Sequence, residues 1–575
     1  MNYKKSLLIS AFALGTGLAV NAQSAKFSLN GLGRSVLTNS AISGPAVDAD
    51  NTIQKSGVSG YNLFDLQTNL AVDSNFQAMA ILRAKSPFGS FFGAATTFEF
   101  RQFKMMGNLG EFKYEIGDVR IEMTPFTVYN NYIVDPTYES QIFAQRREIQ
   151  EYENFNQGNS WLLQGVAGQY FWKVGKEGAG LGVSAFTTRN TATNEVTVPD
   201  RLLSGGRLEY RLTKDLIIGA NAVSMYDISL LTSDFDYSNN VFTGDISYKL
   251  ENDDFIVDAK LEGGLSMYAY SEFVDLDTII DQTDTAYSDG FVDLNVGFTL
   301  KEQKLRFDVS GRRVGVLFSS PAAQSRRFNP LQTPNMLSNI EGAARYQSLY
   351  DRTTAEELYN SKIMPTMMSY NYAYNRSTPY GKATPNRMGG SLRVGTDTSN
   401  HNLDASAKFT YLTEIQGEGT ADLRTFMVAS GGANVHIGKM LDVSRAIDVN
   451  VGARFEDTKR SGAAPVSYAS LLVDAGFAVE VLKRIDLLAG MKYISAEGNE
   501  YSTVLDGFNL ISNFQAFDGK YTETMLSFGA RIRFSPFQSF VVNYNLSNNS
   551  ATDNVTNNTT GYNLGQLFFN YTGRF

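Results

Sequence analysis

The sequence predicts an all-β protein, a transmembrane antiparallel β-barrel of about 22 strands within a range of 18 to 24. Three observations predict this fold: apolar and polar residues alternate over long segments, short and long breaks alternate between those segments, and the last strand ends in an aromatic residue. After residue 22 there is no run of about 18 apolar residues, so no membrane-spanning helix is encoded. Without such a helix a chain can span lipid only as a closed barrel, because lipid cannot hydrogen-bond the free edge of a sheet.

The first 22 residues have the features of a secretory signal peptide. Lys4 and Lys5 form a short basic region, an apolar stretch follows at 7–20, and a Val-Asn-Ala sequence suits a cleavage site. We therefore expect residues 1–22 to be removed and residues 23–575 to form one barrel domain. Removing two lysines and no acids changes the formal net charge from −9 to −11. Such an acidic chain is a poor candidate for nucleic-acid binding.

Cysteine is absent from the chain. A lipid-anchored lipoprotein, a disulfide framework, a thiol nucleophile and a cysteine-based metal site are therefore excluded.

The alternating segments are long. Between residues 255 and 269 the odd positions are apolar or small, whereas the even positions include Asp258, Lys260, Glu262 and Ser266. A strand of a soluble sheet usually has about five or six residues, so this segment has the length needed to cross a bilayer at a tilt and protrude from it. A soluble sandwich would also alternate, but with shorter strands, and is the less favoured fold. The same pattern recurs at 207–212, 292–300, 305–310, 447–455 and 526–534.

Breaks between the segments form two classes that alternate along the chain. Short breaks are expected near 73–75, 107–110, 174–178, 213–215, 251–254, 301–304, 397–401, 438–443, 482–485 and 535–538. Longer ones are expected at 36–59, 124–159, 191–203, 228–239, 270–288, 319–387, 496–520 and 548–560, with smaller members near 85–92, 413–420 and 457–466. Outer-membrane barrels have this asymmetry, with short periplasmic turns and long extracellular loops. The insertions at 124–159 and 319–387 are the longest.

The final strand places Leu567, Phe569, Tyr571, Gly573 and Phe575 on one face, and the polar residues Gln566, Asn570, Thr572 and Arg574 on the other. This resembles the C-terminal signal of outer-membrane proteins, an edge strand ending in an aromatic residue that the barrel-assembly machinery recognises. The resemblance implies that Phe569, Tyr571 and Phe575 form the assembly signal and that this machinery is a partner during biogenesis.

The whole chain is rich in Tyr and Asn. In this composition it resembles the large outer-membrane barrels of Bacteroidota, which include porin-like and alginate-export-like channels. That resemblance implies an integral protein of a Gram-negative outer membrane, in contact with its lipid.

Residues suited to catalysis are scarce. The only histidines are His401 and His436, which both lie beside expected tight turns and are interpreted as ordinary rim residues. No phosphate-binding loop, calcium loop or helical histidine pair has the required spacing. We therefore expect no enzyme activity, no catalytic residue, no metal and no cofactor.

Charged residues on the polar face of the strands are the more informative set. A charge that faces hydrocarbon costs about 2–4 kcal/mol near the midplane, so these side chains are expected to face the lumen. They could form a constriction with a transverse field that orients polar solutes, or a paired network that only makes the wall rigid; the sequence leaves both open. The candidates are Arg207, Arg211, Arg312, Arg454, Arg531, Arg533, Asp258, Glu262, Asp293 and Asp308.

Two insertions are candidates for contact with a solute or a partner. Residues 319–387 combine arginine with tyrosine, a composition that suits sugar stacking, a protein interface or a self-packed cap. Residues 137–153 have apolar and aromatic side chains at helical spacing, which predicts an amphipathic helix on the barrel mouth or inside the lumen. The interface candidates in the first insertion are Arg326, Arg327, Tyr359, Tyr370, Tyr372 and Tyr374.

About 22 strands enclose a lumen wide enough to need a plug. The first expected strand begins at 27–29, which leaves no room for the N-terminal plug domain of a TonB-dependent receptor. Inward-folded loops, chiefly 319–387, are therefore expected to narrow the pore, unless a partner covers it.

Two functions fit this chain. One is a porin-like channel for small polar solutes or oligosaccharides, narrowed by its long loops. The other is a non-transport barrel, a scaffold or accessory subunit of a multiprotein outer-membrane complex whose loops dock surface lipoproteins or another barrel.

Overall fold

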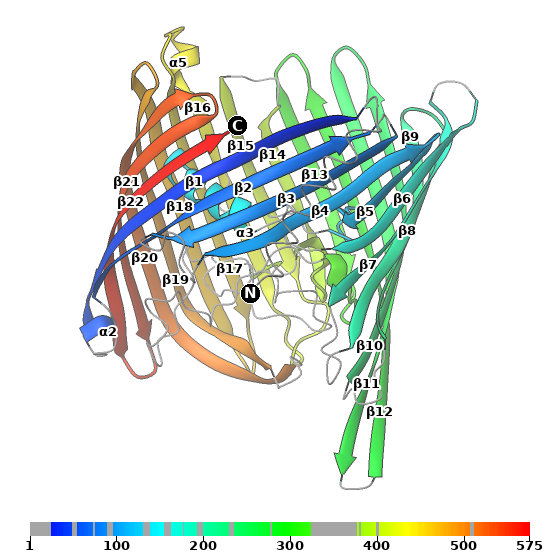
Figure 1. Ribbon diagram of the computed structural model, residues 1–575. Coiled ribbons are helices and arrows are strands. Elements are labelled where there is room, and N and C mark those ends of the chain that lie inside the picture. The colour runs from blue at the N-terminus through cyan, green and yellow to red at the C-terminus, as the bar shows by residue number, and fades with distance from the viewer. Residues whose placement is uncertain are drawn as a thin grey trace.

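A computed structural model describes residues 25–48, 55–72, 75–88, 96–129, 138–154, 163–175, 178–191, 199–228, 235–276, 279–323, 376–378, 381–397, 402–505 and 511–575. The described residues form 22 antiparallel strands in one sheet (Figure 1). β1 (Lys26–Ser43) pairs with β2 (Ser56–Ala71) on one side and with β22 (Asn558–Arg574) on the other, which closes the sheet into a barrel. The predicted fold class and strand number are confirmed.

The remaining strands each pair with their neighbours in the chain. They are β3 (Phe76–Pro87), β4 (Thr97–Leu109), β5 (Phe112–Asp118), β6 (Gln164–Lys173), β7 (Gly180–Thr191), β8 (Asp200–Arg211), β9 (Leu216–Ile228), β10 (Phe235–Glu251), β11 (Phe255–Leu276), β12 (Ile279–Leu300), β13 (Leu305–Val314), β14 (Arg387–Thr396), β15 (Leu403–Thr413), β16 (Thr425–His436), β17 (Ile447–Arg460), β18 (Val466–Leu482), β19 (Ile485–Leu505), β20 (Ile511–Ser535) and β21 (Gln538–Asp553).

The two ends of the barrel differ. One end, which we call the short-turn rim, has the tight connections such as 110–111, 301–304 and 483–484, together with α5 (Ile437–Met440). The C-terminus and the start of β1 lie toward this rim, at the top of Figure 1. The opposite end, the long-loop rim, has α2 (Pro45–Asp48) and the longer connections.

Several strands extend further than the sequence predicted. Breaks were expected at 36–59, 270–288 and 496–520, but β1 and β2 continue through half of the first range, and β11, β12, β19 and β20 continue through most of the other two. The two long insertions begin earlier than expected, because regular strand structure ends at Asp118 and Val314. Beyond the apolar belt both faces of a strand can be polar, so alternation disappears from the sequence while cross-strand hydrogen bonds continue.

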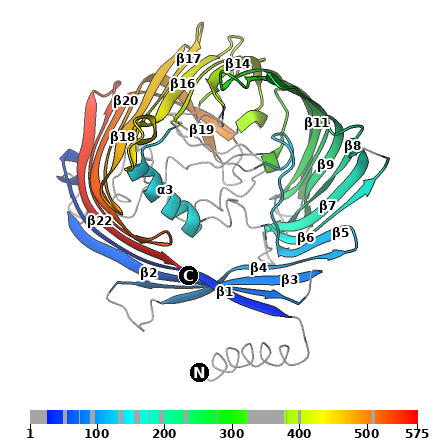
Figure 2. The same ribbon diagram turned by 90° about the horizontal axis from the view of Figure 1, so that it is seen from above.

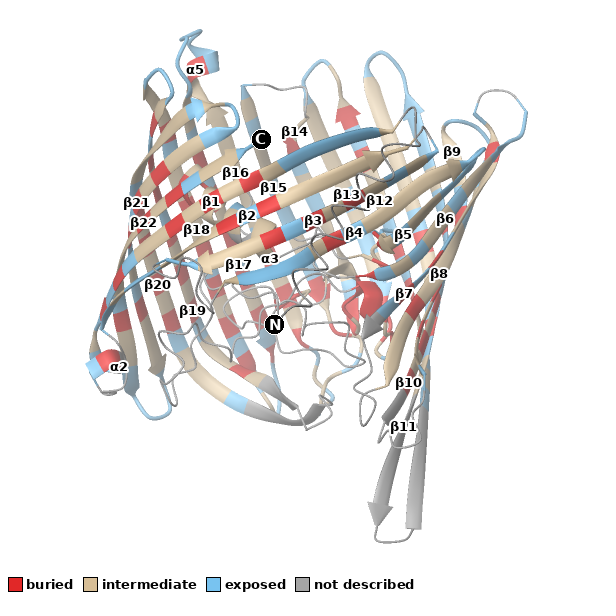
Figure 3. Ribbon diagram, in the orientation of Figure 1, coloured by how far each residue is buried: buried red, intermediate tan, exposed pale blue. Residues whose placement is uncertain are grey.

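The barrel has apolar residues outside and polar residues inside. On β11, Leu261 and Leu265 are 45% and 42% exposed on the outer face, whereas Glu262 and Ser266 on the inner face are 2% and 0% exposed. Buried positions recur along most strands between more exposed ones (Figure 3). A water-soluble barrel would bury its apolar face, so this inverted pattern is the one that a lipid environment requires.

The lumen contains α3 (Gln141–Asn154), which lies inside the ring of strands when the barrel is viewed along its axis (Figure 2). This is the helix that the sequence predicted near 137–153. Most of its residues are Gln, Glu, Arg and Ala, which are good helix formers, and its first turn begins with a hydrogen bond from the Ala144 amide to the Ser140 carbonyl, 2.9 Å long. No helix among the described residues is both long and apolar enough to cross a membrane.

The C-terminal residue takes part in the closure of the barrel. The Gly31 amide donates to the Phe575 carbonyl at 2.9 Å, and the Phe575 amide donates back at 3.1 Å. The Phe575 ring stacks on Phe64 with 5.6 Å between ring centroids. A Cβ at Gly31 would lie 2.3 Å from the Phe575 ring and 2.6 Å from the Asp65 carbonyl oxygen, so only glycine fits beneath the terminal ring.

We expect Gly31→Ala to lower the free energy of unfolding by about 1–3 kcal/mol, because the added methyl group overlaps fixed backbone as well as the ring. Gly33→Ala is the matched control on the same face of β1, because a Cβ there has no heavy atom within 4 Å. It should leave stability unchanged or raise it by up to about 1 kcal/mol. Denaturant unfolding in lipid vesicles measures both, and equal effects of the two variants would contradict the proposed role of the terminal ring.

Candidate functional site

The first end of α3 is held against the inner wall formed by β17, β18 and β19. The Ser140 amide donates to a carboxylate oxygen of Asp474 at 2.9 Å, and the Asn450 side chain donates to the Glu139 carbonyl at 2.6 Å. The Glu139 carboxylate forms an ion pair with Lys492, whose side chain is 1% exposed. The helix therefore begins at a buried set of charges that strands from the C-terminal half supply.

Glu139 also accepts a hydrogen bond from Arg147, the seventh residue of α3, at 2.7 Å. Burial raises the pKa of the Glu139 carboxyl. The positive charges of Lys492 and Arg147 lower the same pKa by more than burial raises it, so the pKa lies below the ordinary carboxylate value. The carboxylate therefore stays ionised at neutral pH and holds both cations.

Close packing accompanies these charges. Ile142 and Phe143 are 1% exposed and belong to a dry cluster with side chains of β18, β19 and β20. The wall beneath them is glycine: a Cβ at Gly490 would lie 2.7 Å from Ile142, and one at Gly476 would lie 2.4 Å from Ser140. The absence of side chains at these two positions lets the helix approach the wall this closely.

The other end of α3 binds the inner wall of β1–β4. The Tyr152 hydroxyl donates to Asp65 at 2.7 Å, and the same carboxylate receives two hydrogen bonds from Arg83, at 2.7 and 2.8 Å, and one from Arg101 at 3.0 Å. The Arg101 guanidinium lies 4.3 Å from the centroid of the Tyr152 ring. Asp65 and Arg83 have side chains that are 2% and 5% exposed, so this is a buried charge network.

Glu153, the next residue, extends the attachment to β1. Its carboxylate accepts hydrogen bonds from Arg34 at 2.9 Å and from the Tyr61 hydroxyl at 2.6 Å, and it pairs with Lys85 at 3.2 Å. Between the two ends, Arg146 lies 4.9 Å from the ring centroid of Phe568 on β22. We call α3 with these contacts the lumen helix; it is fixed at both ends and crosses the strands where the barrel closes.

A second inward structure lies on the opposite wall and consists of residues 119–129 and 316–323. The Ser320 hydroxyl donates to the Phe126 carbonyl at 2.7 Å, and the Tyr129 amide donates to the Ala322 carbonyl at 2.9 Å. The Phe126 ring, which is completely buried, stacks on Phe291 of β12 with centroids 3.9 Å apart. These two segments therefore hold each other and share a dry core with the wall.

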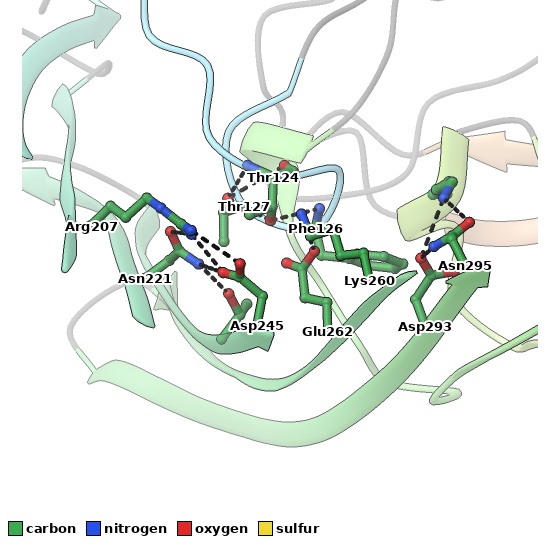
Figure 4. Close-up of polar contacts among 12 residues, drawn as sticks. Thr124, Phe126, Thr127, Arg207, Asn221, Asp245, Lys260, Glu262, Asp293 and Asn295 are labelled. Atoms are coloured by element: carbon green, nitrogen blue, oxygen red, sulfur yellow. Dashed lines mark hydrogen bonds and ion pairs between the residues drawn. The ribbon is translucent and has the colours of Figure 1, made fainter. Parts of the chain in front are cut away.

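The wall behind this structure carries paired charges (Figure 4). Arg207 donates to Asp245 at 2.5 and 3.0 Å and to Asn221 at 3.0 Å. Glu262 lies beneath the turn formed by Thr124 and Thr127, beside the stacked Phe126 ring (Figure 4).

Each predicted lumen charge lies on the inner face of its strand, and most have ion-pair partners on the same wall. Arg306 links Asp258 to Asp308, at 2.9 and 2.7 Å, and Asp486 holds both Arg531 and Arg533 at 2.7 Å. Further pairs include Arg207–Asp245, Arg211–Glu209, Glu262–Lys260, Asp293–Lys382 and Arg454–Glu456. Arg312 stands opposite Asp293 in the strand register.

These candidates are distributed from β8 to β20, so the structure does not gather them at one constriction. They form local pairs, which is the arrangement expected of a network that makes the wall rigid.

Other predicted residues lie outside the described part of the chain: His401 and the loop candidates Arg326, Arg327, Tyr359, Tyr370, Tyr372 and Tyr374. His436 is described; its Nδ1 lies 2.6 Å from a carboxylate oxygen of Asp448 at the short-turn rim. Phe569 and Tyr571 are on β22, where they are the register partners of Leu37 and Ser35 of β1. Among the described residues no group of three or more metal-ligating side chains could hold an ion.

The residues that anchor the lumen helix were missed, chiefly Asp65, Arg83, Arg101, Asp474 and Lys492. Each carries the same signal as the predicted lumen charges, a charged residue on the polar face of an alternating strand. The predicted lumen charges all lie on other strands, and none was predicted on β2–β4, β18 or β19.

The described lumen also contains a pocket of about 330 Å³ between the wall of β3–β7 and the inward residues 120–123. Its wall residues include Lys113 and Glu115 of β5, only a few residues from the tight turn 110–111. The pocket therefore lies on the short-turn side of the inward segment. We call it the lumen pocket.

The sequence matches no protein-family model and no curated protein. Three similar solved structures are outer-membrane or transport proteins. OccK2 (OpdF) of Pseudomonas aeruginosa in complex with glucuronate is 10% identical, with a TM-score of 0.33 over 96% of this chain and 98% of that one. The ferric citrate transporter FecA in its unliganded form is 7% identical, with a TM-score of 0.49 over 95% and 79%. Wzi of Escherichia coli is 11% identical, with a TM-score of 0.29 over 78% and 83%. These likenesses concern the barrel architecture alone.

We expect Asp65→Asn to lower the free energy of unfolding by about 3–5 kcal/mol, because it removes the buried carboxylate that Arg83 and Arg101 share. Denaturant unfolding measures this change, and limited proteolysis reports whether the lumen helix becomes accessible. The control is Asp48→Asn, which breaks an exposed pair with Lys55 and should have little effect. Equal and small changes in both variants would contradict the anchoring role of Asp65.

Proposed function

We propose that the protein is an outer-membrane channel that admits small polar solutes through a lumen narrowed by the lumen helix. The observation that supports this proposal best is the closed barrel with an apolar exterior and a charged interior, a combination that suits a polar path through lipid. Short turns face the periplasm in barrels of this kind, so the short-turn rim is assigned to the periplasmic side.

The lumen helix is proposed as the main fixed obstacle in the path. A helix with its side chains is about 10–12 Å wide, and 14 residues extend for about 21 Å. Buried ion pairs at both ends hold it against the wall, so it narrows the lumen permanently. The sequence had assigned this role chiefly to residues 319–387, most of which lie outside the described part of the chain.

Single-channel recording in planar bilayers tests the proposal. Deleting residues 138–154 should raise conductance about twofold or more, because it removes an obstacle about 10–12 Å wide. The double substitution Tyr152→Ala and Glu153→Ala should give a smaller rise with more open-channel noise, because one end of the helix is released.

The control for these recordings is Lys249→Gln, which breaks an exposed pair with Glu251 near the short-turn rim and should leave conductance unchanged. Heat-modifiable migration in gels establishes that each protein is folded. A folded wild-type barrel that never conducts would contradict the channel, and a deletion without effect on conductance would contradict the role of the helix.

A second candidate function is a scaffold that docks a surface lipoprotein or another barrel. Its support is the hairpin of β11 and β12, which extends from the long-loop rim in Figure 1. The two strands stay paired as far as Leu276 and Ile279, whereas the pairing of β12 with β13 begins only at Phe291.

Mild detergent extraction followed by mass spectrometry tests the scaffold. A stoichiometric partner that is lost when residues 273–282 are deleted would support it. Isolation of the wild-type barrel alone would oppose it.

A further inference from the structure

Arg312 on β13 differs from the other five arginines that were predicted to line the lumen. Those five each form an ion pair with a carboxylate; they are Arg207, Arg211, Arg454, Arg531 and Arg533. The guanidinium group of Arg312, by contrast, has no hydrogen bond or ion pair with any residue in the described part of the chain. Its side chain is only partly buried, so a solute in the lumen can reach it.

An enclosed charge without a counter-charge is costly. Arginine cannot avoid this cost by losing its proton, because its guanidinium stays protonated in proteins. The position of Arg312 therefore favours any anion that enters the lumen.

The acid opposite Arg312 is already engaged by other groups. Asp293 of β12 is the register partner of Arg312. Its carboxylate instead accepts hydrogen bonds from Lys382 at 3.3 Å and from the Asn295 side chain at 2.5 Å (Figure 4). On the other side, the register partner of Arg312 is Gly389 of β14, which has no side chain.

The next acid along the inner face of β13 is also engaged. Asp308 lies four residues before Arg312 and pairs with Arg306 at 2.7 Å and with Arg393 of β14 at 3.0 Å. Both acids thus hold other cations, and the charge of Arg312 is left in excess on this part of the wall.

Two serine hydroxyls lie beside Arg312 on the same face. Ser310 is two residues before Arg312 on β13, and Ser391 of β14 is the register partner of Ser310. Their Oγ atoms lie 2.7 Å apart. One hydroxyl hydrogen lies between the two oxygens, so the hydrogen of the other hydroxyl can be donated to a ligand.

The backbone around Arg312 is rigid. Val314, two residues further along β13, is completely buried in the dry core that it shares with Phe126 and Phe291. Arg312 therefore lies at the short-turn edge of the second inward structure, on a fixed part of the wall. A cation and a hydroxyl in fixed positions are a preorganised pair of binding groups.

We infer that Arg312 binds the carboxylate of a small hydroxy acid on its way through the barrel. The planar guanidinium can donate two parallel hydrogen bonds to a carboxylate, and the ligand supplies the counter-charge that the wall lacks. The serine hydroxyl donates to the hydroxyl oxygen of the same ligand. This inference rests on the proposed channel and names the class of solute.

Isothermal titration calorimetry of the full barrel in detergent tests the inference, with lactate as the probe. We expect saturable binding of lactate, and binding weaker by about tenfold or more in Arg312→Gln, because this variant loses a charge-assisted hydrogen bond. Arg312→Lys keeps the charge but loses the two-pronged geometry, so its affinity should lie between the other two. Lactamide, the uncharged amide of lactate, should not bind, and propionate, which lacks only the hydroxyl, should bind about fivefold more weakly than lactate.

The matched control is Arg393→Gln. It also removes an arginine charge from the inner wall, one strand away, but this arginine already pairs with Asp308. It should therefore bind lactate within about twofold of the wild type. Heat-modifiable migration in gels establishes that each variant is folded.

Equal binding of lactate and lactamide would overturn the inference, as would an Arg312→Gln variant that is folded and binds lactate like the wild type. Tighter binding of inorganic phosphate or of propionate than of lactate would overturn the solute class. Because calorimetry does not depend on conduction, its failure is separable from failure of the channel. A barrel that conducts but does not bind lactate refutes only the inference about Arg312, and a barrel that binds lactate but never conducts refutes only the transport function.

Discussion

Lipid offers no hydrogen bonds, and this constraint determines the architecture of the whole chain. Every strand must find a partner on both sides, so the first strand must pair with the last, over a register from Leu32 and Arg574 to Ser43 and Asn563. The same constraint turns apolar side chains outward and leaves the polar ones in an enclosed lumen. Residues that would lie at the surface of a soluble protein are thus confined with one another.

That confinement explains how the lumen is organised. A buried charge is tolerated only when it is paired and hydrogen-bonded, and the inner wall provides such partners from strand to strand. The lumen helix uses the same chemistry at both of its ends, with Glu139 on Lys492 and Tyr152 on Asp65. On the opposite wall the inward structure adds aromatic packing, with Phe126 stacked on Phe291.

The features that could be predicted from the sequence are those that depend on the residue pattern within a single strand. Alternation assigns Leu261 to the outside and Glu262 to the inside, and the structure agrees. The breaks reveal the number of strands but not their length, because the part of a strand that extends beyond the apolar belt lacks the alternating pattern. The helix at 141–154 was also visible as a periodicity. Its binding sites were not, because Asp65 and Asp474 become its partners only through the curvature of the closed barrel.

The lumen helix also constrains the order in which the molecule can be built. Glu139 and Lys492 are 353 residues apart, and the strands that receive the first end of the helix lie far later in the sequence than the helix itself. The other end binds β1–β4, which are among the earliest strands. An assembling sheet that is still open can carry the helix on its early strands, but only a nearly complete one can receive both ends. Docking of both ends of the helix therefore coincides with closure of the barrel. A segment in the first third of the chain thus reaches its final contacts only when the strands of the last third are in place.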